Sequence, residues 1–146
     1  MTQTTYMQAD KKMNLTNEEQ KTLINLANEA RRHAYVPYSK YPVGAALRTK
    51  TGRIYTGVNI ENAAYPHTMC AERVAIFKAV SEGETEFEVI AVVTNNGGSP
   101  CGGCRQVMSE FGLDTIVLIA DGEGNLQKEL TVAELLPEAF TPVHLL

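Results

Sequence analysis

The sequence predicts an α/β protein in which one β-sheet is layered with helices. Segments with helical spacing of apolar residues alternate with short segments rich in Val and Ile, and polar or Gly-bearing turns separate them. The chain has 146 residues and is 44% hydrophobic. That length and composition suit one domain with one core and leave little room for a second.

The chain is expected to begin with a mobile extension followed by a helix. Residues 1–14 lack hydrophobic periodicity, so the folded domain is predicted over residues 15–146. Thr16 and Glu19 form a capping-box pattern that opens the helix, and Pro37 ends it. Its apolar positions recur at helical spacing: Leu23, Leu26, Ala27 and Ala30.

A strand pair and a second helix are predicted next. Residues 43–49 and 53–58 have the pattern of strands, and residues 50–52 form the hairpin turn between them. The second helix is predicted to start near Cys70 and to stop before Gly83, which suits a C-terminal cap.

The second half of the chain continues this alternation. A strand over 88–94 leads through a polar loop at 95–99 to a short helix over 103–111, which Gly112 closes. A further apolar strand is predicted over 115–120.

The last elements follow a turn at 121–125. Residues 126–130 can form a final strand. Thr131 and Glu134 make a second capping box, which starts a short helix that Pro137 interrupts.

Charge and composition exclude several classes of partner. The net charge is −4 and the 13 Lys and Arg residues are scattered, whereas proteins that bind long nucleic acids need a clustered basic face. We therefore expect no polynucleotide partner. There is no apolar run long enough to span a membrane and no signal-peptide pattern at the start, so a cytoplasmic protein is expected.

The three cysteines carry the strongest chemical signal. Cys70 begins the second predicted helix, and Cys101 and Cys104 lie where a loop turns into the third. Helix N-termini favour thiolates over thiols. Three thiolates can bind one Zn²⁺ and leave the fourth tetrahedral position open to water, as in catalytic sites. An odd number of cysteines also argues against a disulfide framework.

Charged residues beside the cysteines suit hydrolysis at such a metal. Glu72 can take a proton from water and deliver it to a ring nitrogen and a leaving amine. Three thiolates leave the cluster with a net negative charge, which opposes the acidity of bound water. Arg73 and Arg105 are expected to offset this charge by donating hydrogen bonds to the sulfurs.

Each motif alone has another explanation. A Cys-x-x-Cys pair also occurs in thiol redox sites, and a buried Cys70 can simply fill the core. A redox pair needs neither Cys70 nor Glu72, so the combination favours a catalytic metal. Zinc deaminases of nucleobases join such a Cys₃ site to a glutamate that is not a ligand.

The chain resembles the cytidine deaminase family, specifically its short, homotetrameric type. The resemblance runs from about residue 17 to about residue 140 and rests on five runs: 38–46, 57–65, 70–73, 99–106 and 134–137. It implies a three-layer α-β-α fold with one mixed sheet of about five strands, and one Zn²⁺ per subunit of a homotetramer.

The resemblance also implies a nucleoside site. An Asn-x-Glu pair binds the ribose hydroxyls in the family, and it falls on Asn59 and Glu61, whose side chains project to the same side. Tyr41 is expected to stack on the pyrimidine, although many members carry Phe there. Backbone groups of Ala71 and Ser99 are expected to contact the base carbonyl and the exocyclic amine. The alternatives are turn chemistry at Asn59, a solvated Glu61 and a strand-edge Tyr41.

Other residues near the motifs are assigned by the same resemblance. Phe140 matches a C-terminal aromatic that reaches a neighbouring subunit's site. Tyr65 is expected at a subunit contact or the site rim, or else in the core. A full set of cysteines makes His67 surplus as a ligand, and His33 and His144 are expected at the surface or in packing.

The predicted function is hydrolysis of cytidine and 2′-deoxycytidine to uridine and 2′-deoxyuridine plus ammonia, in pyrimidine salvage. Three alternatives remain open. A deaminase of nucleoside analogues such as blasticidin would have no need of Glu61 as a sugar-binding residue. A polynucleotide editor conflicts with the low basicity. A non-enzymatic zinc module would recruit a fourth ligand and would not need Glu72. The preference between ribose and deoxyribose is also open.

Overall fold

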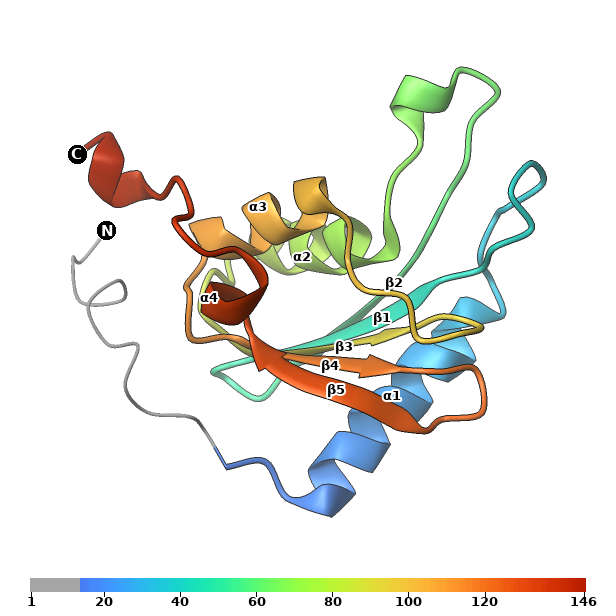
Figure 1. The fold of residues 1–146 in the computed structure, drawn as a ribbon, viewed down its shortest axis with the longest axis horizontal. Coiled ribbons are helices and arrows are strands. Elements are labelled where there is room, and N and C mark those ends of the chain that lie inside the picture. The colour runs from blue at the N-terminus through green and yellow to red at the C-terminus, as the bar shows by residue number, and fades with distance from the viewer. Residues whose placement is uncertain (1–13) are drawn as a thin grey trace.

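A computed structural model describes residues 14–146, in which five strands form one sheet between two layers of helices (Figure 1). The extension expected over 1–14 therefore lies, apart from Asn14, outside the described residues. The elements are α1 (Asn17–Arg31), β1 (Gly44–Thr49), β2 (Ile54–Val58), η2 (Tyr65–His67), α2 (Ala71–Ser81), β3 (Phe87–Val93), α3 (Gly102–Glu110), β4 (Ile116–Ala120), β5 (Leu126–Thr131), α4 (Val132–Leu135) and η3 (Pro142–His144).

This order confirms the predicted alternation of helices and strands. The final strand, which the pattern only allowed, is present as β5. The two 3₁₀ turns η2 and η3 were not predicted. None of the helices in residues 14–146 is both long and apolar enough to cross a membrane.

The sheet is mixed, with the strand order β2-β1-β3-β4-β5. Strands β3 and β4 are parallel and α3 connects them, while the other three pairs are antiparallel. Nearly every residue of β3 and β4 is buried. Such unbroken apolar strands are expected where helices cover both faces of a sheet. The predicted mixed sheet of about five strands is confirmed.

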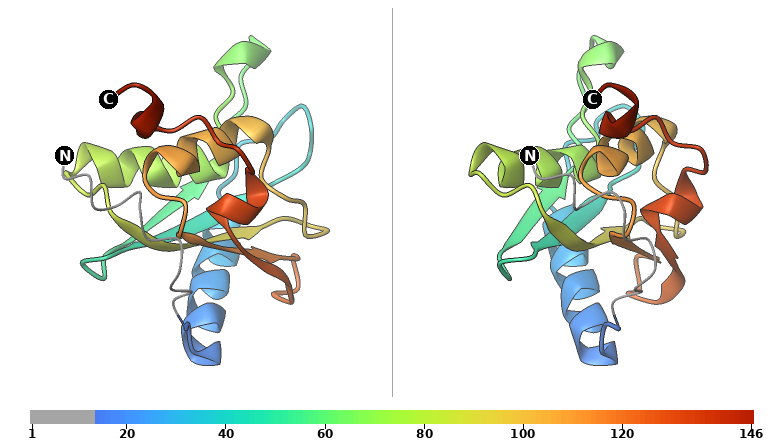
Figure 2. Two further views of the ribbon diagram at one scale, coloured as in Figure 1. Left: turned by 60° about the vertical axis from the view of Figure 1, so that its left-hand side comes forward. Right: turned by 90° about the vertical axis from the view of Figure 1, so that its left-hand side faces the viewer.

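Helix α1 covers one face of the sheet, and α2 and α3 cover the other, as both views of Figure 2 show. The buried side chains form two separate clusters, one between the sheet and each layer of helices. Residues of α1 pack with alternate residues of β3 and β4, and residues of α2, α3 and α4 pack with the residues between them. The predicted three-layer arrangement is confirmed.

The buried side of α1 differs from the prediction at one position. Leu23, Ile24 and Ala27 are buried, whereas Leu26 is 37% exposed. At 100° per residue the three buried side chains span a narrow arc, and Leu26 projects about 60° outside it. The placement of Leu26 on the apolar face was therefore wrong.

The two capping boxes differ in outcome. The box of Thr131 and Glu134 forms completely. At α1, Thr16 accepts a hydrogen bond from the Glu19 backbone N–H (3.1 Å), but the Glu19 carboxylate lies 3.6 Å from Arg48 of β1 instead of turning back. Only half of the first predicted box is made.

Glycine allows a helix to rest directly on each face of the sheet. A Cβ atom added to Gly44 of β1 would lie 2.0 Å from the carbonyl oxygen of Ala27 in α1. A Cβ atom on Gly57 of β2 would lie 2.3 Å from the Ala71 oxygen and 2.6 Å from the Ala75 nitrogen in α2. The backbone contact at Gly57 sets the position of the N-terminal end of α2.

Gly57→Ala is expected to lower the free energy of unfolding by about 3 kcal/mol, because the new methyl group collides with backbone atoms that cannot move independently. Gly52→Ala is the control. A Cβ atom there meets nothing within 4 Å, but the residue has a φ of 90°, so about 1 kcal/mol of backbone strain is expected. Denaturant unfolding of both variants measures the difference. Equal losses of unfolding free energy in the two variants would show that α2 does not need its close approach to the backbone of Gly57.

Candidate metal centre and active site

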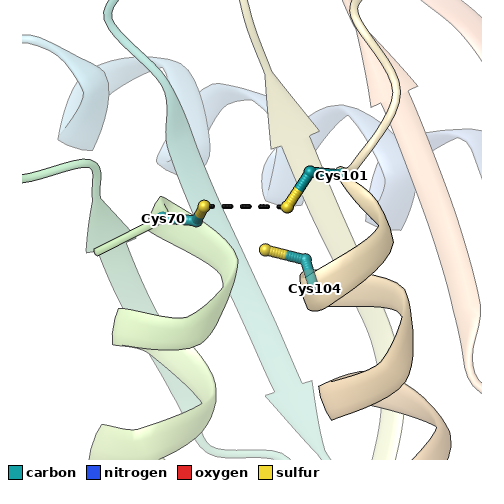
Figure 3. A group of neighbouring side chains, drawn as sticks. All are labelled: Cys70, Cys101 and Cys104. Carbon is teal, nitrogen blue, oxygen red and sulfur yellow. Dashed lines mark hydrogen bonds between the residues drawn. The ribbon is translucent and has the colours of Figure 1, made fainter. Parts of the chain in front are cut away.

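The N-terminal ends of α2 and α3 bring the three cysteines together. Cys70 is the N-cap residue of α2 and Cys101 is the N-cap residue of α3, and neither side chain caps its own helix. Cys104 lies in the first turn of α3. Figure 3 shows the three sulfur atoms pointing toward one another between the two helix ends.

The sulfur positions fit a tetrahedral metal ion. All three Sγ atoms lie within 4.8 Å of one another, and those of Cys70 and Cys101 are 3.9 Å apart. Zn–S bonds of about 2.3 Å would place two sulfurs of a tetrahedral site about 3.8 Å apart. The same separation is far longer than a disulfide bond, and all three cysteines are free. A soft set of three sulfurs suits Zn²⁺.

The cysteines differ in exposure and in protonation. Cys104 is buried, Cys70 is half-buried and Cys101 is exposed. A hydrogen bond from the Cys104 thiol, with help from Arg73, lowers the pKa of Cys70 to about 5. The same hydrogen bond, together with burial and the nearby Glu72 carboxylate, raises the pKa of Cys104. Of Cys70 and Cys104, the Cys70 sulfur is therefore the first to ionise.

The structure distinguishes the two arginines expected beside the sulfurs. Nη2 of Arg73 donates to Sγ of Cys70 at 3.2 Å, as predicted. Arg105 instead donates from Nε to the Pro100 carbonyl and from Nη1 to the Leu135 carbonyl, both at 2.8 Å.

The expectation that Arg105 donates to a thiolate is therefore wrong. Arg73 follows Cys70 by three positions, which places both on one side of α2. Arg105 follows Cys101 by four positions, which likewise places both on one side of α3, but its guanidinium donates to the Pro100 and Leu135 carbonyls instead of to a sulfur. Arg105 instead ties the loop before Cys101 to the end of α4.

Glu72 lies in the first turn of α2 and is 5% exposed. Its Oε2 is 3.5 Å from Sγ of Cys104. Burial, and secondarily the negative charge of Cys70, raises the pKa of this carboxyl. A carboxyl in such surroundings holds its proton more tightly than an exposed one and can exchange it with a bound reactant.

A pocket of about 280 Å³ opens beside the cysteines. Its lining includes eight predicted site residues: Tyr41, Asn59, Glu61, Cys70, Ala71, Glu72, Ser99 and Cys101. Sequence reasoning did not select six others: Ser39, Val43, Thr68, Met69, Thr94 and Gly98. All of these but Thr94 lie within two positions of a predicted site residue. Thr94 follows the end of β3, and the carboxyl end of a parallel strand is the usual signal for such a position.

Asn59 and Glu61 hold the segment that carries Tyr41. The Asn59 amide donates to the Tyr41 carbonyl at 2.8 Å, and its oxygen accepts from the Val43 N–H at 2.9 Å. Glu61 Oε1 accepts from the backbone N–H groups of Tyr38 and Ser39 at 3.0 and 3.1 Å. Hydrogen bonds from Ser39 in particular lower the pKa of Glu61. Both side chains keep hydrogen-bonding capacity for a ligand, including Glu61 Oε2.

Two predicted aromatic residues do not line this pocket, although Tyr65 lines an adjoining one that shares Ser39, Glu61 and Thr68 with it. Phe140 is 56% exposed, and its ring stacks on His144 with centroids 5.2 Å apart. Tyr65 is 66% exposed and meets the edge of Tyr38 at 5.6 Å, so the alternative that it belongs to the core is wrong. His67 is exposed and stands outside the group of metal-binding sulfurs.

Comparisons with known proteins show the family to which the chain belongs. Residues 17–120 match the family model of the cytidine and deoxycytidylate deaminase zinc-binding region. The chain is 53% identical over 122 residues to a cytidine deaminase of Sporosarcina psychrophila, covering 82% of this chain and 89% of that protein. It is 39% identical over 129 residues to a blasticidin-S deaminase of Bacillus cereus, covering 82% of this chain and 90% of that protein.

A solved structure gives the same result for the fold. The crystal structure of cytidine deaminase from Burkholderia pseudomallei superposes with a TM-score of 0.79 at 43% identity, covering 86% of this chain and all of that one. The chain belongs to the cytidine and deoxycytidylate deaminase family.

Proposed function

We propose that this chain is a zinc-dependent hydrolase that converts cytidine and 2′-deoxycytidine to uridine and 2′-deoxyuridine plus ammonia. One observation carries the proposal: two cysteines of the Cys₃ cluster line a single pocket together with Glu72, Asn59 and Glu61. Water adds its oxygen to C4 of the pyrimidine, and the bond from C4 to the exocyclic nitrogen breaks.

Cys70, Cys101 and Cys104 would hold the metal ion, and their spacing fits Zn²⁺. When bound, Zn²⁺ makes water a better nucleophile near neutral pH. Cys101 and half-buried Cys70 line the pocket, so the metal site is open on the side where substrate would enter. An open position is typical of catalytic rather than structural zinc sites.

Glu72 would move the protons. Its carboxylate can take a proton from the attacking water and give it to the pyrimidine ring nitrogen. It can then take the remaining proton of the hydroxyl added at C4 and give it to the exocyclic amine as the C4–N bond breaks. Because the side chain is buried, the proton does not exchange freely with solvent between these steps. Glu61 is the other carboxylate in the lining of this pocket, and its Oε1 already accepts from the backbone N–H groups of Tyr38 and Ser39.

Groups around the pocket would orient the nucleoside. Ala71 is the first residue of α2, so its N–H has no partner within the helix and can donate to the base carbonyl. The Ser99 carbonyl can accept from the exocyclic amine, and the half-buried Tyr41 ring offers a stacking surface. Asn59 and Glu61 would read the ribose hydroxyls.

The finer biological assignments belong to the same proposal. We infer a homotetramer, because Tyr65 and Phe140 leave large aromatic surfaces exposed on the described chain. Three free thiols suit a reducing compartment such as the cytoplasm. Action on free nucleosides would place the enzyme in pyrimidine salvage.

A substrate panel tests the proposed function. Zinc-loaded protein is expected to consume cytidine with far higher kcat/KM than cytosine, since only the nucleoside reaches Asn59 and Glu61. Loss of the cytosine absorbance band follows each reaction, with cytidine monophosphate and blasticidin S as further substrates. Absence of cytidine turnover would refute the proposal. Equal use of free cytosine would remove the ribose-binding role, and preference for blasticidin S would favour the analogue deaminases.

Glu72→Gln is expected to reduce kcat by about 10³-fold or more, because the amide cannot carry the proton. Zinc content per subunit is expected to stay at the wild-type value, since the side chain is not a ligand. Metal analysis and steady-state kinetics measure the two effects. A variant that kept more than a tenth of wild-type kcat would exclude Glu72 as the proton carrier.

Arg73→Gln is expected to move the acidic limb of the kcat profile to higher pH by about 0.5–1 unit, because removing a positive charge raises the pKa of nearby acids. Arg73→Lys keeps the charge and serves as the matched control. Its pH profile of kcat is expected to lie between those of the wild type and Arg73→Gln. Zinc content is measured in parallel. An unshifted profile for Arg73→Gln at full zinc content would show that the guanidinium does not tune the site.

A further inference from the structure

The Tyr41 hydroxyl joins the two segments that flank the pocket. It donates a hydrogen bond to Oδ1 of Asn96 at 2.7 Å. Tyr41 lies on the segment that Asn59 holds, while Asn96 lies on the loop between β3 and α3. That loop continues to Ser99 in the pocket wall. One side-chain contact therefore spans the two walls.

The loop is also shaped around this hydroxyl. A Cβ atom added to Gly98 would lie 2.6 Å from Oη of Tyr41, closer than real Cβ atoms approach another atom. Gly98 does not have a φ in the left-handed region, so the hydroxyl rather than the backbone conformation disfavours a side chain. The Gly98 N–H donates to Oγ1 of Thr94 at 2.7 Å, which sets the turn against the end of β3.

Other contacts hold the two ends of the same loop. Arg31 of α1 donates to Oδ1 of Asn95 at the start, and Arg105 donates to the Pro100 carbonyl at the end. Between these anchors, the Tyr41–Asn96 bond joins the loop to the segment that carries Tyr41, while Thr94 ties Asn96 and Gly98 to the end of β3. Loss of the Tyr41–Asn96 bond would loosen the part of the loop that carries Ser99 relative to the Tyr41 ring but leave the part that carries Cys101 in place.

We propose that the Tyr41 hydroxyl, Asn96 and Gly98 form a latch that sets the position of the Ser99 wall relative to the Tyr41 ring. Through its hydroxyl, Tyr41 is a positioning residue for substrate binding, a role separate from stacking by its ring. A phenylalanine would supply the ring without the latch. The kinetic consequence rests on the proposed function, whereas the structural coupling does not.

The first test is a double-mutant cycle with Tyr41→Phe, Asn96→Ala and the pair. Each single variant is expected to raise KM for cytidine about two- to tenfold, the range for one hydrogen bond. Values of kcat are expected to stay within about twofold and zinc content unchanged, because Cys101 keeps its own anchor. The double variant is expected to be no worse than the worse single one. The proposal would be overturned if the effects of the two substitutions on KM were additive in the double variant, or if the variants lost kcat without a change in KM.

Tyr35→Phe is the matched control, since it removes a hydroxyl from a tyrosine that is 58% exposed and absent from the pocket lining. Hydrogen exchange supplies a readout that needs no turnover. Amides of residues 96–99 are expected to exchange faster in Tyr41→Phe and in Asn96→Ala than in wild type or Tyr35→Phe. Unchanged exchange in both latch variants would overturn the proposal. If wild type failed to deaminate cytidine while this pattern held, the proposed function would fail and the latch would stand.

Gly98→Ala gives a second, reciprocal test. The added methyl group is expected to raise KM and speed amide exchange in the wild-type background, because it displaces the Tyr41 hydroxyl. In the Tyr41→Phe background the clashing oxygen is absent, so adding Gly98→Ala is expected to cause little further change. An equal effect of Gly98→Ala in both backgrounds would overturn the proposal.

Discussion

The site depends on the close approach of α2 to the sheet. The helix rests on Gly57 with no side chain between the two backbones, which fixes the place where α2 begins. That beginning carries Cys70, Ala71 and Glu72. Helix α3 starts at Cys101, after the parallel strand β3, and its first turn faces the same point. Two helix N-termini therefore meet at one place, and each adds a partial positive charge that favours thiolates there.

Two ionisable side chains with different burial, Arg73 and Glu72, determine the charge around the three sulfurs. Arg73 donates to Cys70 and offsets part of the negative charge. Glu72 is buried beside Cys104, where ionisation is disfavoured. These environments separate a group that stays charged from a group that can carry a proton. Arg105 has no part in this balance, since its bonds to two carbonyls fix the loop in front of α3.

The walls of the pocket are held by the same residues that are expected to bind substrate. Asn59 and Glu61 bond to the backbone of the segment that carries Tyr41, and Tyr41 bonds in turn to Asn96 on the opposite loop. Binding and positioning are therefore coupled in this part of the molecule. A change at any of these side chains alters both the contact that it would offer to a nucleoside and the shape of the wall around it.

The sequence by itself determined the element order, the Cys₃ set and Glu72. Helical and strand periodicities are local, and a helix start at Cys70 follows from its neighbours, so these features need no knowledge of distant contacts. The resemblance to a family extended this to the mixed sheet and to the residues of the pocket. Local patterns did not show which side of α1 is buried, and Leu26 was misplaced for that reason.

Only the tertiary structure decided where the side chains of Arg105, Tyr41 and Phe140 lie. Arg73 and Arg105 stand three and four positions after the N-cap cysteine of their helices, yet Arg73 donates to a sulfur and Arg105 donates to carbonyls of the preceding loop and of α4. The partner of the Tyr41 hydroxyl lies 55 positions away in sequence. Contacts of this kind depend on how strands and helices pack, and no periodicity in the chain encodes them directly.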